Sequence, residues 1–234
     1  AHRGAYHLSD KRAAAGRDTC TARHTLPPRD ETFENTPESM RRAVGMGAAM
    51  VVFDVAPSKD GRTVLYHDWS VYCRTNGKGE TRDLTLAELQ GLDMGYGFPA
   101  DGAKSFPLRG KGVGKMPTVE DGLAALPVHP ILFNFKSKDA AEADQLFAIL
   151  KAAGRDSAKI GDAFYGAAAP VKRMRELLPG NWSFDLRREA LRCSKDYVTW
   201  GWTGIVPESC RDGVVATPVH YQWGLWGSPP PGIR

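Results

Sequence analysis

The sequence contains no apolar run long enough to cross a bilayer, and its net charge is only +4. The lysines and arginines are dispersed along the chain, and no DNA- or RNA-binding motif is present, so nothing indicates a nucleic-acid partner. The glycine-rich stretches "GMGAA" and "GKGVG" lack the spacing of a phosphate-binding loop. These absences leave a small molecule as the expected partner, and they leave the oligomeric state open.

Cysteine is scarce, and no two of the 4 cysteines form the CxxC pair that is typical of zinc sites. Cys20, Cys73, Cys193 and Cys210 allow two disulfides in any of three pairings, and we expect the two local pairs, Cys20–Cys73 and Cys193–Cys210. Disulfides predict a periplasmic or secreted location, which a leader removed before residue 1 would also fit. Buried thiols in a cytoplasmic protein are the alternative.

Helix-start signals and short apolar runs alternate along the chain. Thr36, Thr85, Thr118 and Asp139 each have the position and spacing of a helix N-cap. The predicted helices cover residues 37–47, 85–91, 118–125, 139–153 and 169–178. The predicted strands, which are rich in Val, Ile and Phe, cover residues 50–55, 63–67, 130–136, 159–165, 182–185 and 213–219.

The alternation of strands and helices after residue 85 is typical of a parallel sheet. At 234 residues, we expect a single α/β domain over residues 1–234 with a TIM-like (β/α)₈ barrel. A doubly wound open sheet is the alternative, although no glycine-rich nucleotide loop follows a strand. A polar segment at about 5–33 would form a long loop after the first strand of the barrel.

Polar side chains lie at or near the ends of several predicted strands. Asp54, His67, Asn134 and Lys136 all have such positions. Because strand ends of a barrel converge on one mouth, where active sites form, we expect these four side chains to lie close together.

The residue types favour phosphoryl chemistry. Arg3 and Lys136 supply a guanidinium and an ammonium that can hold a phosphate, and Asn134 is a further candidate for binding the substrate. His2 and His67 can divide the acid and base roles, because an imidazole titrates near neutral pH. Asp68 can orient one of these rings, and its alternative role is a simple turn residue after the strand.

The order and spacing of short motifs over roughly residues 1–138 resemble those of the glycerophosphodiester phosphodiesterase family. The motifs are HRG, ENT, DV, KDG, HD, RTNGKG, LTLAEL and MPTVEDGL. The resemblance implies a TIM-like barrel that cleaves glycerophosphodiesters to an alcohol and glycerol 3-phosphate. It also implies that His2 and His67 are the catalytic acid–base pair and that Arg3 and Lys136 bind the phosphate.

The resemblance further implies a divalent cation, calcium or magnesium, held by a Glu-x-Asp on one strand and by a glutamate two residues before Lys136. This chain departs from that pattern, because Val52 and Asn134 occupy the two glutamate positions. Asp54 and Asn134 offer two oxygens, with Glu34 as a further candidate ligand, whereas calcium usually takes about six to eight. We therefore expect a weak site that suits magnesium better than calcium, or a metal-independent reaction.

Two other interpretations stay open at this point. The same scaffold can run a changed reaction, in which a neighbouring hydroxyl of the substrate attacks first and gives a cyclic phosphate. Alternatively, loss of the acidic ligands marks a catalytically silent phosphate-binding protein. The joint presence of two histidines and two cationic side chains favours an active phosphodiesterase. The sequence does not identify the leaving alcohol or say whether lipids are substrates.

Overall fold

The computed structural model describes residues 1–5, 7, 20–100, 103–185 and 188–211. The chain divides into two compact units, Ala1–Ser183 and Phe184–Arg234. The expectation of one domain over residues 1–234 stays a prediction.

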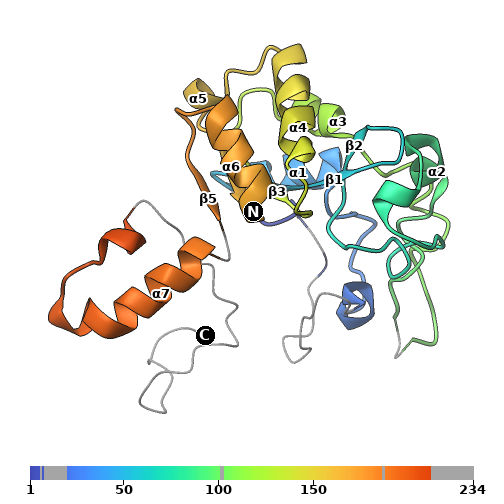
Figure 1. The fold of residues 1–234 in the computed structure, drawn as a ribbon. Coiled ribbons are helices and arrows are strands. Elements are labelled where there is room, and N and C mark those ends of the chain that lie inside the picture. Colours follow the sequence, from blue (N-terminus) through green and yellow to red (C-terminus); the bar gives the residue numbers. More distant parts are fainter. Residues whose placement is uncertain (6, 8–19, 101–102, 186–187, 212–234) are drawn as a thin grey trace. The chain divides into compact units, whose positions relative to one another are not determined.

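A mixed sheet of five strands, in the order β2-β1-β3-β4-β5, organises the described residues (Figure 1). Its strands are β1 (Val51–Pro57), β2 (Thr63–Leu65), β3 (Ile131–Phe135), β4 (Ala163–Gly166) and β5 (Ser183–Asp185). β1, β3 and β4 are parallel to one another, and β2 pairs antiparallel with β1. His2 forms an isolated parallel bridge with Val52, so the start of the chain also lies beside β1.

The described part of the first unit contains six α-helices, of which the first three begin at the capping signals of the sequence, whereas the fourth begins after Ala140 and not at the predicted cap Asp139. They are α1 (Pro37–Gly45), α2 (Leu86–Gly91), α3 (Val119–Ala125), α4 (Ala141–Ala152), α5 (Ser157–Ile160) and α6 (Ala168–Leu177), with 3₁₀ helices at Thr21–His24 and Thr81–Asp83. Thr36, Thr85 and Thr118 cap α1, α2 and α3, as predicted, and each of the three forms a reciprocal capping box.

The strand predicted over residues 159–165 is partly wrong. Its first two residues belong to the short helix α5, and the strand is Ala163–Gly166. The side chain of Asp156 caps α5 by accepting a hydrogen bond of 3.0 Å from the amide of Lys159. Gly161 ends the helix in the left-handed region, at a φ of 88°. The predicted strand at 213–219 lies outside the described residues.

The two faces of β1 differ in chemistry. Val51, Phe53 and Val55 are almost completely buried in the main hydrophobic core, which α1, α3, α4 and α6 also line. Val52 and Asp54 point to the opposite face, because side chains of a strand alternate. Burial of the first face stabilises the unit, and the opposite face is available for chemistry.

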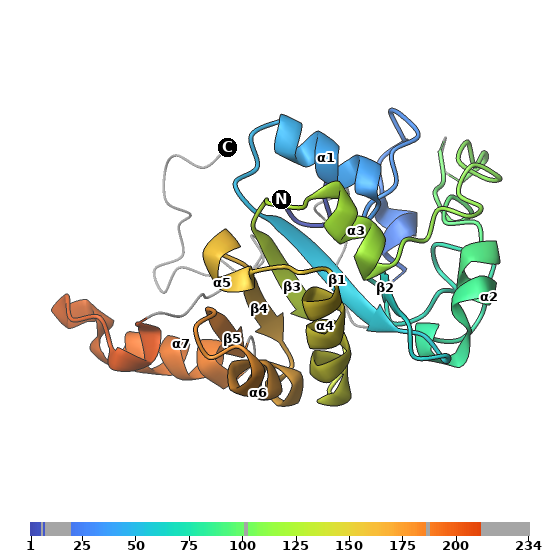
Figure 2. The same cartoon turned by 90° about the horizontal axis from the view of Figure 1, so that it is seen from above.

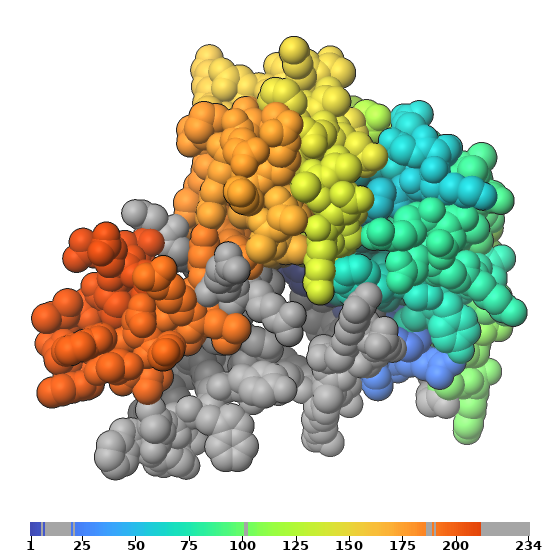
Figure 3. Space-filling model, in the orientation of Figure 1, coloured from blue at the N-terminus to red at the C-terminus, as the bar shows by residue number. Residues whose placement is uncertain are grey.

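Helices α4 and α6 lie side by side over the core face of the sheet, as Figures 1 and 2 show. Leu146 of α4 and Met174 of α6 are fully buried beneath them. At their exposed sides, Arg173 bonds to Asp144 at 2.8 and 2.9 Å. The two helices form a continuous surface in the space-filling view of Figure 3.

The second unit contains α7 (Arg188–Trp200) and 3₁₀ helices at Gly201–Thr203 and Glu208–Cys210. The disulfide Cys193–Cys210 joins α7 to the last of these, and Cys20–Cys73 lies in the first unit. Both predicted pairings are therefore confirmed. Among the described residues, no helix combines the length and apolar character that a bilayer crossing requires.

Candidate active site

Three polar side chains form a row across the sheet face that lies opposite the core. The strand register places Asp54 beside Asn134, and Asn134 beside Tyr165. Asp54 has no exposed surface, and its Oδ1 accepts a hydrogen bond of 2.7 Å from Nδ2 of Asn134. Lys136, just beyond β3, places its Nζ 3.8 Å from the same oxygen. The structure thus brings Asp54, Asn134 and Lys136 together.

His2 and His67 face each other beside Asp54. Their ring centroids are 5.8 Å apart, with the rings nearly perpendicular. One nitrogen of each ring and one carboxylate oxygen of Asp54 all lie within 4.8 Å of one another. His2 reaches this point through its bridge to β1, and His67 follows β2. The two segments that flank β1 therefore deliver both imidazoles to one place.

Two neighbours fix the tautomer of His67. Nη2 of Arg3 lies 2.5 Å from Nε2 of His67, and a guanidinium can only donate, so Nε2 accepts. Nδ1 therefore carries the proton and donates it to Oδ1 of Asp68 at 2.8 Å. Nε2 is the basic nitrogen of this ring.

Arg3 and Glu34 form an ion pair next to the imidazoles. Nη1 of Arg3 donates to Oε1 of Glu34 at 3.0 Å, and Nη1 of Arg74 lies 3.1 Å from the same oxygen. Arg3 has a φ of 59°, which is uncommon for a residue with a side chain. Its carbonyl accepts a hydrogen bond of 2.9 Å from the amide of Asn35, which helps to hold this conformation. Two guanidinium groups thus neutralise Glu34.

Burial lowers the pKa of both imidazoles. Desolvation, followed by the charge of Arg3, lowers the pKa of His2 to about 4, although the residue retains some exposed surface. Desolvation also lowers the pKa of His67 from its usual 6.5, against the opposing effects of Asp68 and Asp54. Both rings are therefore predominantly neutral at pH 7 before an anion binds.

The charge of Asp54 is balanced locally. Burial raises the pKa of Asp54, but the charge of His67 when that ring is protonated, together with the charges of Lys136 and Arg3, outweighs burial, and the net shift is downward. Burial lowers the pKa of Lys136, and the negative charge of Asp54 opposes that effect. Asp54 therefore stays a carboxylate at pH 7.

The residues around Asp54 do not fit a calcium or magnesium site. Val52 presents an aliphatic side chain on the same face of β1. Both oxygens of Asp54 meet amide donors, Asn134 at 2.7 Å and Asn35 at 3.4 Å, so Asn134 turns its NH₂ group toward the carboxylate. The buried Oδ1 of Asn35 has no hydrogen-bond partner among the residues that the structure describes, but it adds only one oxygen where calcium needs about six or more.

The ligand atoms that lie close enough to share one ion belong, in the described part of the chain, to His2, Asp54 and His67. Glu34, which the sequence made a candidate ligand, is not in this group. Two imidazoles and one carboxylate suit a transition metal better than calcium or magnesium. The adjacent guanidinium and ammonium groups oppose any cation here by their charge.

Three residues at the site have contacts that the sequence did not assign. Arg74 and Asn35 lie within the motifs RTNGKG and ENT, and those motifs were the available signals. Tyr165 is a neighbour of Asn134 through the strand register alone, and burial raises its pKa. The sequence around Tyr165 does not predict this contact, because it depends on the pairing of β3 with β4.

Known proteins resemble parts of this chain. A glycerophosphodiester phosphodiesterase of Caldanaerobacter subterraneus subsp. tengcongensis is 43% identical over 65 residues, which are 28% of this chain and 27% of that protein. Human glycerophosphodiester phosphodiesterase 1 is 30% identical over 135 residues, 53% of this chain and 39% of that protein. The chain thus spans well under half the length of these curated relatives.

Solved structures share the fold. The glycerophosphoryl diester phosphodiesterase domain of the uncharacterized protein Rv2277c from Mycobacterium tuberculosis superposes with a TM-score of 0.59 at 22% identity, over 70% of this chain and 59% of that chain. A phosphodiesterase from Oleispira antarctica, solved in complex with the product sn-glycerol-3-phosphate, gives 0.54 at 20% identity, over 79% and 64%. These likenesses confirm the predicted fold class, α/β of the TIM-like type.

The two histidines and the charged side chains of the site lie within the segment that a family model matches. The model of the glycerophosphoryl diester phosphodiesterase family matches residues 2–148, which include His2, Asp54, His67 and Lys136. This match covers more than half of the 234 residues. The chain belongs to the glycerophosphoryl diester phosphodiesterase family.

Proposed function

We propose that this chain hydrolyses glycerophosphodiester-like substrates, with His2 and His67 as the acid–base pair and Arg3 and Lys136 as the phosphate-binding cations. The observation that supports this proposal is one juxtaposition. Two imidazoles, with centroids 5.8 Å apart, lie beside Asp54, the guanidinium group of Arg3 contacts one of them, and the ammonium group of Lys136 lies 3.8 Å from Asp54. In-line displacement at phosphorus needs positive charge on the non-bridging oxygens and proton transfer at both ends.

His67 is suited to be the base. When Nε2 takes a proton from the attacking water, the hydrogen bond from Nδ1 to Asp68 stabilises the imidazolium that forms. The water oxygen forms a bond to phosphorus while the bond to the alcohol oxygen breaks. His2, protonated before attack, gives its proton to the leaving oxygen. The products are glycerol 3-phosphate and an alcohol, and one proton has moved onto His67.

Arg3 and Lys136 are suited to hold the phosphate because each places a cationic nitrogen within 4 Å of Asp54, at 3.9 and 3.8 Å. Arg3 contacts Nε2 of His67, and Lys136 lies 3.8 Å from Asp54. An incoming phosphodiester anion would exchange these internal contacts for charge-assisted bonds to its own oxygens. Such an exchange places phosphorus next to the basic nitrogen of His67.

We propose that this reaction does not use calcium or magnesium at the position where the family resemblance implies one. The support is the donor set around Asp54, where Val52 replaces a carboxylate and two amide groups donate to the remaining one. Two cationic side chains next to Asp54 already supply positive charge. The substrate class is supported by the neighbour that was solved with sn-glycerol-3-phosphate.

A panel of phosphodiesters, assayed with calcium, with magnesium and with a chelator, tests the proposal. We expect glycerol 3-phosphate as the product in all three conditions, and loss of turnover in Lys136→Met. Lys138→Met is a matched control, because Lys138 is exposed two residues further along the chain. A cyclic phosphate product would point to the changed reaction. Binding of phosphodiesters without turnover in any condition would contradict hydrolysis.

We also propose that the protein works in an oxidising compartment, periplasmic or extracellular. Its support is that all four cysteines form disulfides. Thiol labelling of the protein as isolated from its source cell tests this, with no labelled cysteine as the expected result. Labelling of all four cysteines would point to a reducing compartment.

A further inference from the structure

The motif RTNGKG, to which the proposed function assigns no role, contributes one buried arginine to the site. Nε of Arg74 donates to Oδ2 of Asp68 at 2.7 Å, and its Nη1 lies 3.1 Å from Oε1 of Glu34. Asp68 in turn accepts from Nδ1 of His67, and Glu34 accepts from Arg3. The side chain of Arg74 is only 4% exposed.

These contacts close into a ring of five side chains. From Arg74 the ring runs through Asp68 to His67, from His67 Nε2 to Arg3 at 2.5 Å, and from Arg3 through Glu34 back to Arg74. Two guanidinium groups alternate with two carboxylates, and the neutral imidazole closes the circuit. Arg74 is therefore the member that connects the orientation of His67 with the position of Arg3.

The rest of the motif holds Arg74 in place. Oγ1 of Thr75 donates to the carbonyl of Val71 at 2.7 Å and accepts from the amide of Gly77 at 3.0 Å. Oδ1 of Asn76 accepts from the amide of Asp93 at 2.9 Å. These bonds close the turn and direct the arginine inward.

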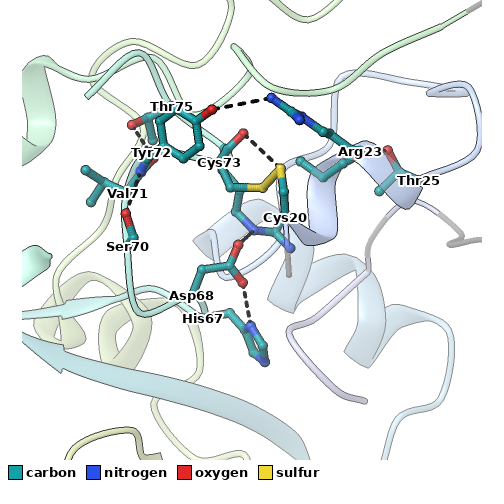
Figure 4. Close-up of a disulfide and its surroundings, with 12 residues drawn as sticks. Cys20, Arg23, Thr25, His67, Asp68, Ser70, Val71, Tyr72, Cys73 and Thr75 are labelled. Atoms are coloured by element: carbon teal, nitrogen blue, oxygen red, sulfur yellow. Dashed lines mark hydrogen bonds and ion pairs between the residues drawn. A yellow bond between two sulfur atoms is a disulfide. The ribbon is translucent and has the colours of Figure 1, made fainter. Parts of the chain in front are cut away.

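A disulfide precedes Arg74 directly. Cys73 is bonded to Cys20, 53 residues earlier in the chain. Figure 4 shows Asp68 between His67 and the disulfide-bonded segment of Cys73. The covalent link therefore attaches the backbone of Arg74 to the segment that precedes Glu34.

We propose that Arg74 is a positioning residue that sets the tautomer of His67 through Asp68 and holds Arg3 through Glu34, and that the Cys20–Cys73 disulfide fixes Arg74 for this task. Arg74 does not touch the substrate. Its effect on kcat rests on the proposed function, but its effect on the His67 ring does not. A bare Asp68 carboxylate would attract a proton to His67, so removal of Arg74 should raise the pKa of that ring.

The direct test is nitrogen NMR of the His67 ring in the wild type, Arg74→Lys and Arg74→Met. We expect the Nδ1–H tautomer in the wild type, a mixture of tautomers in Arg74→Met, and an upward pKa shift of about half a unit or more. Arg74→Lys keeps the charge without the fork that spans two carboxylates, so it should fold and show an intermediate effect. A folded Arg74→Lys with the wild-type tautomer and titration would overturn the proposal.

We expect kcat to change in the same variants in which the tautomer and titration of His67 change. We expect kcat to fall on the order of 10²-fold in Arg74→Met with a smaller change in KM, because a misplaced catalytic group costs rate more than binding. Arg155→Met, which removes another buried arginine, should leave the His67 titration unchanged. If the chain proves inactive, the NMR result still decides the role of Arg74, so the two failures are distinguishable.

The disulfide has a matched control in the second unit. Cys20→Ser with Cys73→Ser should move the His67 titration in the same direction as Arg74→Lys. Cys193→Ser with Cys210→Ser, which removes the other disulfide, should leave it unchanged. Equal His67 titrations in both double variants would overturn the proposal that the Cys20–Cys73 disulfide holds Arg74 in place.

Discussion

Arg74 and Arg155 are both buried arginines paired with an aspartate, but they differ in what lies beyond that aspartate. Arg155 holds Asp162 through two hydrogen bonds of 2.7 and 2.8 Å and donates to three backbone carbonyls, among them that of His129. Its partners are fixed groups at the amino-terminal ends of β3 and β4. Arg74 instead holds Asp68, whose other oxygen accepts from a titratable ring.

The difference separates a structural network from a functional one. A cavity of about 1030 Å³ lies next to Arg155, lined by residues such as Leu123, Val128 and Ile149. It is mostly apolar and has no histidine among the described residues that line it, whereas His2 and His67 lie at the other end of the sheet. The convergence of titratable groups, rather than the size of a hollow, therefore identifies the site.

The largest expected effect on activity comes from replacing His67, the titratable residue of the Arg74 network. His67→Gln should lower kcat/KM by about 10²- to 10⁴-fold, because general acid–base catalysis contributes a factor of that size. His129→Gln is the matched control, because only the backbone carbonyl of His129 contacts Arg155. Steady-state kinetics on both variants, with folding checked by circular dichroism, measure the contrast. Equal losses of kcat/KM in the two variants would contradict the distinction between a functional Arg74 network and a structural Arg155 network.

The next effect concerns stability. Arg155→Met leaves the Asp162 carboxylate, which has no exposed surface, without its guanidinium partner, although the amide of Ile131 still donates to Oδ1 at 3.0 Å. We expect a loss of about 3–5 kcal/mol in the free energy of unfolding, as is usual when one member of a buried pair is removed. Urea denaturation measures this loss. The kcat/KM of the remaining folded enzyme should keep its pH dependence, and a shifted profile would contradict a purely structural role for Arg155.

The pH dependence sharpens the comparison further. The mechanism needs one protonated and one neutral imidazole, and the pKa of each ring is lowered from 6.5, that of His2 to about 4. The singly protonated pair is therefore lost as pH rises, and kcat/KM should fall by about tenfold per pH unit well above 6.5. Rates from pH 4 to 9 in a constant-ionic-strength buffer give the profile. A rate that rises up to pH 8 would exclude this division of roles.

Local and periodic features could be read from the sequence. The threonine caps of α1, α2 and α3 depend on spacings of three residues, and the strand period places Val52 and Asp54 on one face. The disulfide pairs followed from sequence proximity. The convergence of Asp54, Asn134 and Lys136 followed from the rule that strand ends meet. Each of these inferences needs only short-range patterns and one assumed topology.

Long-range contacts could not be read in the same way. Glu34 and Arg74 meet only because the loop after β2 folds back toward the start of α1, and no spacing encodes that approach. The amide of Asn134 could have offered its oxygen to a metal, but the neighbouring carboxylate selects its NH₂ group. The run at 159–165 was predicted as a strand, but its first residues belong to α5, which the side chain of Asp156 caps. In each case the deciding partner lies outside the motif itself.

The measurement that tests the account most directly is the rate of glycerophosphodiester hydrolysis after exhaustive chelation, for the wild type and Val52→Glu. The account predicts full turnover by the chelated wild type, because the charges of Arg3 and Lys136 do not depend on an ion. In Val52→Glu, the added carboxylate next to Asp54 should create calcium binding that isothermal titration calorimetry detects. Strict dependence of the wild type on added calcium or magnesium would contradict the account.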